Sequence, residues 1–309
     1  MKTLVTGGAG FIGSNLVDAL LARGDEVVVL DDLSTGKREN LSQARAARLV
    51  ELDIRDFDSV SSAVGEAAPE VIFHLAAQID VRRSVADPAH DSRINVEGTV
   101  NVARAAHEHG VGRLVNTSTG GAIYGTADTI PTPESHLPAP EAPYGLSKFC
   151  AEQYCELYTR LHGLNTVSLR YGNVYGPRQD PHGEAGVVAI FCGKLLEGGT
   201  PVIFGDGRQT RDYVYVGDVV EANLLAAQKR DVRGPVNIGT GVPKSVLDIV
   251  GVLARHSAED DGFSPEHEPA RPGEVEHSTL EVSRAREVLA WTAKVDLEEG
   301  LDRTLASLR

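Results

Sequence analysis

Residues 6–13 of the chain read T-G-G-A-G-F-I-G, between an apolar run at 2–6 and a helical pattern at 11–23. Starting at Gly8 the glycines form G-x-G-x-x-G, and starting at Gly7 they form G-x-x-G-x-x-G. A tight strand-to-helix turn needs glycine so that its backbone N–H groups come close to a pyrophosphate at the helix N-terminus. The stretch therefore predicts a dinucleotide-binding turn, with an ordinary strand–helix turn without a ligand as the alternative.

A carboxylate follows at the distance that such a turn requires. Asp31 lies 18 residues after Gly13, at the end of the next apolar run. An acidic residue about 20 residues on accepts hydrogen bonds from a ribose 2′-hydroxyl and repels a 2′-phosphate. The spacing favours NAD over NADP, with Asp32 as the rival for this role. Asp53, at the end of the third apolar run, could reach the adenine edge.

Short apolar runs rich in Val, Ile and Leu alternate with helical patterns through the first half of the chain. Such runs are typical of parallel strands buried on both faces. Repeated strand–helix–strand units predict a Rossmann-like, doubly wound parallel sheet of the α/β class. The strands are expected at 2–6, 26–30, 49–52, 71–76, 113–117 and 166–171.

The pattern changes after Gly172, which predicts a smaller C-terminal substrate domain. The elements expected there are a helix at 187–196, strands at 201–204 and 212–216, N-caps at Asp218 and Ser245, and a long loop at 257–277. The chain is expected to return to the large sheet at 235–238, which makes the second domain discontinuous. The predicted domains are 1–171 plus about 214–240 for the cofactor, and about 172–213 plus 241–309 for the substrate.

Charge and cysteine content exclude several classes of protein. The 309 residues include 30 Lys and Arg against 44 Asp and Glu, a net charge of −14. An acidic surface repels phosphate backbones and anionic lipid, so neither nucleic acid nor a membrane is an expected partner. Three cysteines without a C-x-x-C pair predict neither a disulfide framework nor a metal site. Neither a membrane helix of ~20 apolar residues nor a signal peptide is apparent, which favours a cytoplasmic protein.

Tyr144 and Lys148 stand four residues apart in Y-G-L-S-K and therefore share one helix face. A tyrosine with a pKa of ~10 is a poor base, but a nearby ammonium and a positive nicotinamide ring stabilise its phenolate. An incidental pair on a solvated helix is the alternative. The dinucleotide-binding turn upstream favours a catalytic pair.

Further motifs run along essentially the whole chain. They are D-D-L-S-T-G (31–36), H-L-A-A (74–77), Y-G-L-S-K (144–148), R-Y-G-N-V-Y-G-P-R (170–178), I-F-G-D-G (203–207), R-D-Y-V-Y-V-G-D (211–218), N-I-G-T-G (237–241) and R-P-G-E (271–274). With the turn at 6–13, they make the chain similar to the extended short-chain dehydrogenase/reductase family, and within it to the UDP-galactose (UDP-glucose) 4-epimerases. Together the motifs are specific for nucleotide-sugar enzymes and less specific for the sugar.

The resemblance implies which residues hold the cofactor and the substrate. The positions that hold NAD match Gly7, Gly10, Phe11, Ile12, Gly13, Asp31, Asp32, Ser34, Thr35, Gly36, Asp53, Ile54, Leu75, Ala76, Ala77, Tyr144, Lys148 and Tyr171. The positions that hold the nucleoside diphosphate of a UDP-sugar match Asn173, Val187, Val202, Phe204, Arg211 and Arg271. Guanidinium groups suit phosphate oxygens, although a surface ion pair is the alternative for both arginines.

One position departs from the family pattern. The family's catalytic Ser or Thr stands four residues before the Tyr of a Y-G pair, and here that place is Gly120, before Tyr124. The nearest hydroxyl groups belong to Thr119 and Ser118. The role is therefore assigned to Thr119, with Ser118 as the second candidate.

The activity implied by the resemblance is reversible 4-epimerisation of a UDP-hexose, UDP-galactose to UDP-glucose, through a 4-keto intermediate with NAD as cofactor. The rival readings are another nucleotide-sugar enzyme of the family (a 4-reductase, a decarboxylase or a 4,6-dehydratase) and a catalytically dead NAD(P)-sensing module. A 4,6-dehydratase needs an Asp-Glu pair where this chain has Gly120, Gly121 and Ala122. The pair Tyr144 and Lys148 argues against a dead module.

The resemblance also implies which sugars are accepted and how two subunits assemble. Bulky residues at the position of Ser278 exclude a 2-N-acetyl group in the family, so this small residue predicts some activity on UDP-GalNAc and UDP-GlcNAc. The family forms homodimers through two helices per subunit, expected here at 91–108 and 147–161. Because the implied substrate is an anion, Arg211, Arg271 and Lys148 are expected to face inward, away from the acidic surface.

Overall fold

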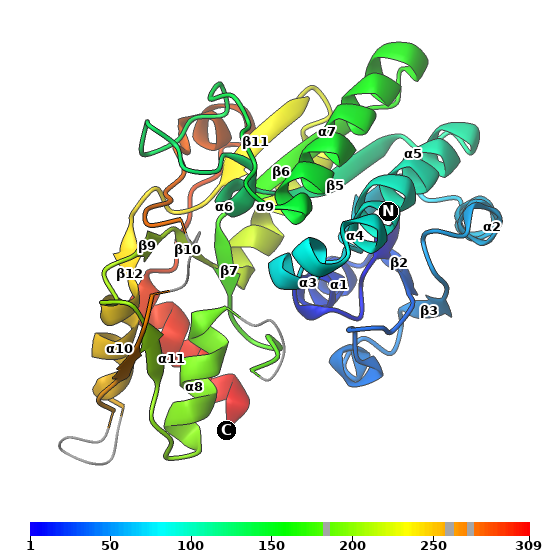
Figure 1. Cartoon of the computed structure of the whole chain (residues 1–309). Helices are drawn as coiled ribbons and strands as arrows, with labels where there is room; N and C mark the ends of the chain where they lie inside the picture. The colour runs from blue at the N-terminus through cyan, green and yellow to red at the C-terminus, as the bar shows by residue number, and fades with distance from the viewer. Residues whose placement is uncertain (182–185, 257–262, 271–274) are drawn as a thin grey trace.

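A single seven-stranded sheet organises the computed structural model, which describes residues 1–181, 186–256, 263–270 and 275–309 (Figure 1). The strand order is β11-β6-β5-β4-β1-β2-β3, and every neighbouring pair is parallel. The strands are β1 (Lys2–Thr6), β2 (Glu26–Asp31), β3 (Arg48–Glu51), β4 (Val71–His74), β5 (Arg113–Thr119), β6 (Thr166–Tyr171) and β11 (Gly234–Ile238). The doubly wound α/β prediction is confirmed, including the late return of the chain beside β6.

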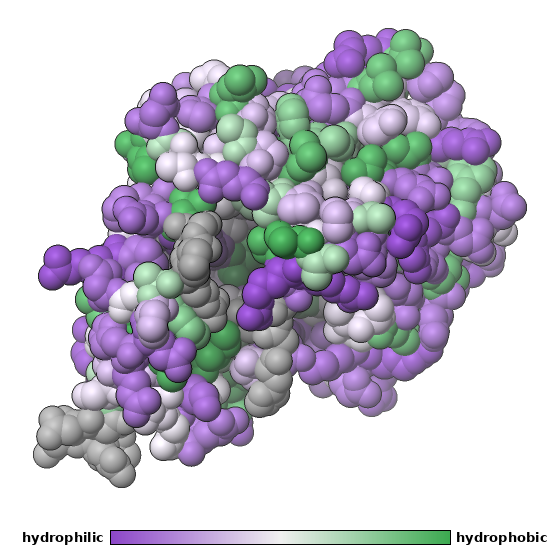
Figure 2. All heavy atoms as spheres, viewed as in Figure 1, coloured by the Kyte–Doolittle hydropathy of each residue, from purple (hydrophilic) through white to green (hydrophobic). Residues whose placement is uncertain are grey.

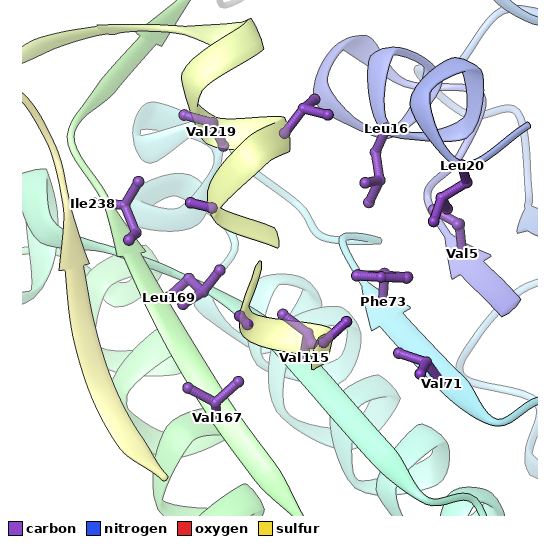
Figure 3. Packing of buried hydrophobic residues seen from close by; sticks show 14 of the residues in the cluster. Val5, Leu16, Leu20, Val71, Phe73, Val115, Val167, Leu169, Val219 and Ile238 are labelled. Carbon is purple, nitrogen blue, oxygen red and sulfur yellow. The ribbon is translucent and has the colours of Figure 1, made fainter. Parts of the chain in front are cut away.

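Successive side chains of each strand point to opposite faces of the sheet, and helices cover both faces. In β1, Val5 packs in one buried cluster with residues of α1 (Phe11–Ala22) and α9 (Val216–Gln228), part of which is shown in Figure 3. Leu4 packs in the cluster on the opposite face. The helices of that face are α2 (Phe57–Ala67), α5 (Gly98–Glu108) and α7 (Pro143–His162). Burial on both faces explains why the strands are almost continuous runs of apolar residues.

The strand order reverses between β1 and β4. From β1 the chain winds to β2 and β3 on one side, and from β4 it winds to β5, β6 and β11 on the other. In open parallel sheets, ligands bind at the carboxyl ends of the strands where the order reverses. The glycine turn at 7–13 follows β1, and residues 75–77 follow β4 at this same point.

The remaining elements before β6 connect the sheet. They are η1 (Arg38–Leu41), α3 (Val81–Ala86), α4 (Pro88–Ser92), η2 (Arg93–Glu97) and α6 (Gly120–Ile123). In Figure 1, α3 and α4 lie between the N-terminal half of α7 and α1. This places α3 and α4 near the point where the strand order reverses.

A second group of elements, which we call the minor region, packs around its own apolar cluster. It consists of the two-stranded pairs β7–β10, β8–β13 and β9–β12 and the helices α8, α10 and α11. The bounds are β7 (Asn173–Tyr175), α8 (Val187–Leu196), β8 (Val202–Phe204), β9 (Thr210–Arg211), β10 (Tyr213–Tyr215), β12 (Lys244–Ser245), α10 (Val246–Ala254), β13 (Glu266–Glu268) and α11 (Leu297–Leu308). Between β13 and α11, η3 (Ala285–Leu289) packs instead in the cluster of the large sheet. The face in Figure 2 is mostly hydrophilic and is hollowed between the sheet and the minor region.

Two expectations for this part of the chain are wrong, and one is confirmed. Asp218 is not an N-cap, because α9 already begins at Val216; its carboxylate accepts hydrogen bonds from the backbone N–H groups of Lys294 and Val295. Within the expected loop at 257–277, residues 266–268 form strand β13 beside β8. Ser245 caps α10 as expected, in a reciprocal capping box with Asp248.

Among the described residues, no helix combines the length and apolar character needed to cross a membrane. The same residues hold no cluster of three or more His, Cys, Asp and Glu side chains suited to a metal ion.

Candidate active site

The glycine turn fits closely against the segment that follows β4. Gly7 has a positive φ of +69°, and a Cβ at this residue would lie 2.6 Å from the backbone nitrogen of Ala76. A Cβ at Gly13 would lie 2.1 Å from the carbonyl oxygen of Gly7. Glycine is therefore required at both positions: at Gly7 for the left-handed backbone, and at Gly13 for the close packing of helix on turn.

The N-terminus of α1 suits an anionic group. Gly10 is the N-cap, no side chain caps the helix, and its first turn, which contains Phe11 and Ile12, has no acidic residue. Backbone N–H groups at a helix start carry partial positive charge and need acceptors. A dinucleotide pyrophosphate would supply both the acceptors and the negative charge, so these residues fit NAD.

The loop after β2 is bonded to the glycine turn. Asp31 accepts hydrogen bonds from the backbone N–H groups of Ala9 (2.9 Å) and Leu33 (2.9 Å). Burial raises the pKa of Asp31, and these two bonds oppose the rise. Gly36 also packs against this carboxylate, since a Cβ at Gly36 would lie 2.8 Å from Asp31 Oδ1. A carboxylate has further lone pairs, so Asp31 can hold the turn and still accept a ribose hydroxyl.

Of the other predicted cofactor residues after β2 and β3, Asp32, Ser34 and Thr35 are exposed, Asp53 is half-buried and Ile54 is buried. Asp32 accepts bonds from the backbone N–H and the hydroxyl of Ser34, and Thr35 lies beside them. Asp53 is engaged by Arg55, whose side-chain bonds lower the pKa of this carboxyl group. The side chain of Ile54 is buried against the sheet.

A buried histidine links the ends of β1 and β4. The Thr6 hydroxyl accepts bonds from the N–H groups of Leu75 and Ala76, both at 3.2 Å, and lies 2.7 Å from His74 Nδ1. His74 Nε2 lies 2.9 Å from the Thr99 hydroxyl, which donates to the carbonyl oxygen of Asn95. Burial lowers the pKa of His74 to about 3. The imidazole is therefore neutral and structural; it fixes residues 75–77, where Ala77 is half-buried.

Tyr144, Lys148 and Thr119 meet at the C-terminal end of β5. Tyr144 and Lys148 lie one turn apart on α7, and hydrogen bonding by the neighbouring Thr119 side chain opposes the rise in the pKa of Tyr144. Burial raises the pKa of Tyr144 to about 12, while burial lowers the pKa of Lys148 to about 8. The group thus consists of a phenol, a hydroxyl bonded to it, and an ammonium that is 2% exposed.

Two predicted residues lie close by in different surroundings. The Ser118 hydroxyl is buried and has no hydrogen-bond partner among the described residues, whereas Thr119 bonds to Tyr144. The Tyr171 hydroxyl lies 3.3 Å from the Thr117 hydroxyl and 3.0 Å from Asn223 Oδ1. Tyr171 is thus anchored between the sheet and α9, and burial raises its pKa to about 12.

Sequence reasoning missed a buried ion pair behind the catalytic face. Arg170 on β6 donates to both carboxylate oxygens of Glu152, at 2.9 and 2.7 Å, and to the Tyr124 hydroxyl at 2.8 Å. Burial alone would lower the pKa of Arg170, but the Glu152 carboxylate raises it. A spacing signal was present, because Glu152 continues the four-residue series of Tyr144 and Lys148. The pair fixes α7 on β6.

The predicted substrate residues come from separate parts of the minor region. Asn173 is on β7, and its Oδ1 would lie 3.3 Å from a Cβ at Gly121, beside the turn that carries Thr119. The half-buried Arg211 donates to the carbonyl oxygens of Thr210 (2.9 Å) and Glu276 (3.3 Å). The other described members are half-buried: Val187 on α8, Val202 and Phe204 on β8, and Ser278. Arg271, with the motif at 271–274, lies outside the described residues.

Asp212, also missed, holds these segments together. Its buried carboxylate accepts bonds from the backbone N–H groups of Thr240 (2.7 Å), Gly241 (3.0 Å) and Leu280 (3.2 Å), and from the Thr240 hydroxyl (2.7 Å). Ser278 is fixed nearby, since its N–H donates to the Thr210 carbonyl. Arg211 and Ser278 are therefore positioned by long-range bonds.

Comparison with known proteins gives this arrangement its family. Residues 3–239 match the NAD dependent epimerase/dehydratase family. The chain belongs to this family. A UDP-glucose 4-epimerase of Mycolicibacterium smegmatis is 49% identical over 312 residues, which cover 100% of this chain and 99% of the relative.

Solved structures agree with this membership. A UDP-glucose 4-epimerase of Thermotoga maritima, crystallised with UDP-glucose, has a TM-score of 0.95 at 46% identity, covering 100% of this chain and 99% of the other. A UDP-glucose 4-epimerase of Thermus thermophilus in complex with NAD has a TM-score of 0.91 at 44% identity, again covering 100% and 99%. The cofactor of this family is NAD, which the geometry of the glycine turn fits.

Proposed function

We propose that the chain catalyses reversible 4-epimerisation of a UDP-hexose, UDP-galactose to UDP-glucose, through a 4-keto intermediate. The observation that carries the proposal is the grouping of Tyr144 with the buried Lys148 one turn away on α7 and with Thr119 at the end of β5. The names of the close relatives support the same activity. Epimerisation at C4 returns the cofactor to its starting state, so the chain needs no second substrate.

Each of these three residues has a distinct task. Tyr144 takes the proton of the sugar O4 hydroxyl and later returns it to O4, after the configuration at C4 has been inverted. The positive charge of Lys148 lowers the free energy of forming the Tyr144 phenolate. Thr119 donates a hydrogen bond to the phenolate oxygen or to the sugar O4. When bound, NAD supplies the oxidised ring that accepts the C4 hydride and gives it back, and its positive charge favours the phenolate. Gly7, Gly10 and Asp31 are the residues proposed to hold NAD.

The minor region is proposed to bind the UDP moiety. Asn173, Arg211 and Arg271 would contact the diphosphate, and Val187, Val202 and Phe204 would contact the nucleoside. The proposed domains follow from this division: 1–171 plus about 214–240 binds NAD, and about 172–213 plus 241–309 binds the UDP-sugar. The small Ser278 leaves room for a 2-N-acetyl group, so activity on UDP-GalNAc and UDP-GlcNAc is part of the proposal.

The 4,6-dehydratase alternative finds no support at its required positions. A Cβ at Gly120 would lie 2.6 Å from both terminal methyl carbons of Leu280, so an acidic side chain there would displace this residue. Gly121 and Ala122 supply no acid or base. The 4-reductase and decarboxylase alternatives are distinguished by their products.

Assembly and location complete the proposal. We infer a cytoplasmic homodimer in galactose metabolism that packs through α5 and α7. The outer side of α7 supports this, since Tyr154 is 39% and Leu161 is 66% exposed. Large exposed apolar side chains on one helix suit a protein–protein contact.

Product analysis after incubation with UDP-glucose tests the activity. The proposal expects UDP-galactose to form until the mixture reaches equilibrium, without added NAD. A 6-deoxy-4-keto sugar would indicate a dehydratase, and unchanged UDP-glucose would favour a sensing module or another substrate. A matched control is the Tyr144→Phe protein, which keeps the ring and lacks the hydroxyl.

A further inference from the structure

A buried aspartate lies behind the catalytic pair. Asp91, on α4, is 0% exposed, and α4 packs against α7. Its Oδ1 accepts hydrogen bonds from Gln78 Nε2 at 2.7 Å and from Asn95 Nδ2 at 3.1 Å. Its Oδ2 is buried and has no hydrogen-bond partner among the described residues. A buried carboxylate oxygen without a partner is costly, which calls for a functional explanation.

The two donors hold Asp91 rigidly. The Gln78 backbone N–H donates to Asn95 Oδ1 at 2.9 Å, and Asn95 Nδ2 donates back to the Gln78 carbonyl at 2.9 Å. Gln78 Nε2 also donates to the Asp80 carbonyl at 2.9 Å. Because both amide groups are fixed by backbone contacts, the carboxylate cannot turn its free oxygen toward them.

The charge of Asp91 reaches both members of the catalytic pair. It raises the pKa of Tyr144 and the pKa of Lys148, in addition to the larger effects of burial. The other titratable groups facing Lys148 are His74 from β4 and Glu152 and Cys155 from α7.

None of these three groups balances the ammonium. The pKa of His74 near 3 keeps it neutral, and burial raises the pKa of the Cys155 thiol to about 12, so it is neutral too. Glu152 already has Arg170 as its counter-charge. In the described part of the chain, Asp91 is the buried carboxylate near Lys148 that forms no ion pair.

We propose that Asp91 is a positioning residue of the active site, the constant counter-charge that keeps Lys148 an ammonium while Tyr144 gains and loses its proton. The inference rests on the proposed function. When Tyr144 is a phenolate, its own charge balances Lys148; once Tyr144 is a neutral phenol, a buried ammonium remains. Asp91 balances that ammonium in the phenol state, and because its charge is fixed it also raises the pKa of Tyr144.

Asp91→Asn tests this role because the amide keeps the Oδ1 acceptor, removes the charge and replaces only the unpartnered Oδ2, by an NH2 group. The expected result is a pH profile of kcat/KM in which both limbs move toward acid by about 0.5–1 pH unit. The acid limb moves because the phenolate forms more easily without Asp91, and the alkaline limb moves because the ammonium is lost more easily. Glu97→Gln, which removes an exposed carboxylate on the adjoining η2, is the charge-matched control and should leave both limbs in place.

A spectroscopic titration supplies a readout that does not need turnover. The tyrosinate absorbance of the purified protein, minus that of Tyr144→Phe, isolates the ionisation of Tyr144. Asp91→Asn should shift this ionisation to lower pH, which a purely structural role would not do. If Asp91→Asn fails to fold, Asp91→Ser, a smaller neutral acceptor, is measured in the same way.

A folded neutral variant whose pH profile and tyrosinate titration superpose on those of the wild-type protein would overturn the inference. Failure of the proposed function looks different, because the wild-type protein would then fail to interconvert the UDP-hexoses. The tyrosinate titration would still test Asp91 in that case.

Discussion

The cofactor side and the sugar side of the proposed site are built in different ways. On the cofactor side, the turn at 7–13 and the loop at 31–37 are bonded directly, since the Lys37 N–H donates to the Ala9 carbonyl and Asp31 accepts from the Ala9 N–H. On the sugar side, the Asp212 carboxylate ties its own segment to residues 240–241 and to Leu280. Local turn chemistry thus specifies the cofactor side, whereas the sugar side depends on long-range assembly.

Lys148 belongs to the catalytic group on α7, and its replacement should have the largest effect. Lys148→Met keeps the length of the side chain and removes its charge, so kcat should fall by about 10²–10⁴-fold because the phenolate loses its support. Steady-state kinetics at neutral pH measure this effect. An unchanged kcat would show that the pair does not act as a unit.

Combined with Asp91→Asn, which removes the buried counter-charge, the same variant should unfold at a higher temperature. Burial lowers the pKa of Lys148 from its ordinary 10.5 to about 8. At pH values below 8, the buried ammonium therefore lowers the free energy of unfolding. Removing it should stabilise the protein by about 1–3 kcal/mol at neutral pH. This gain should shrink between pH 8 and 10.5, as the wild-type ammonium loses its proton in the folded state. Thermal denaturation across pH measures it, and a gain that grows above pH 8 would contradict the sign.

Asp212→Ala should disrupt the hydrogen bonds of the sugar side and leave the cofactor side unchanged. Four donors lose their acceptor, so the free energy of unfolding should fall by about 2–4 kcal/mol. The KM for the UDP-sugar should rise at least about tenfold while the affinity for NAD stays within twofold. Denaturant titration and calorimetry with NAD separate the two effects. Equal losses of both affinities would contradict the independence of the two sides.

Asp31→Asn should weaken the cofactor side and leave the sugar side unchanged. The amide presents one oxygen and one N–H group, so one backbone bond to the turn is lost with the charge. The affinity for NAD should fall about tenfold. Calorimetric titration of cofactor-stripped protein gives the affinity, with the exposed Asp32→Asn as the matched control. A larger loss in the control would assign the ribose to Asp32.

Ser278→Tyr tests which sugars the sugar side accepts. A bulky ring at this position should lower kcat/KM for UDP-GalNAc at least about tenfold relative to UDP-galactose. Comparison of the two substrates on wild type and variant measures the change. If the wild type does not turn over UDP-GalNAc at saturation, the small residue is not what admits the acetamido group.

Lys37→Ala should have the smallest effect. Its ammonium lies 2.8 Å from Asp180, linking the cofactor loop to the segment that leads into the minor region, but both side chains are well exposed. Exposed pairs of this kind contribute about 0–1 kcal/mol. Thermal denaturation should therefore show a shift close to the error of the method. A loss as large as that of Asp212→Ala would show that the two sides depend on this link.

The same contrast explains how far the sequence could be interpreted. The sheet, the glycine turn and the Tyr144–Lys148 pair were predictable because the hydrophobic periodicity and the spacing of residues in short motifs determine them. Asp218 was misassigned because its carboxylate bonds to residues 294–295, which no local pattern indicates. Strand β13 was missed because a short exposed strand in a charged segment lacks an alternating pattern.

The residues behind the pair were hidden for a related reason. Asp91, Asn95 and Gln78 form one polar cluster, but only the fold shows that the cluster is buried. Asp212 looked like one residue of a motif, and its four hydrogen bonds come from segments about 30 and 70 residues away. Polar groups that act through long-range burial leave no signature in local sequence.

Turnover of UDP-galactose by Tyr144→Phe, without added NAD, tests the central claim most directly. Because only the proton-accepting oxygen is removed, the protein should fold and retain NAD, while kcat falls by about 10²–10⁴-fold. The wild-type protein should form UDP-glucose under the same conditions. Near-wild-type turnover by Tyr144→Phe would contradict the account.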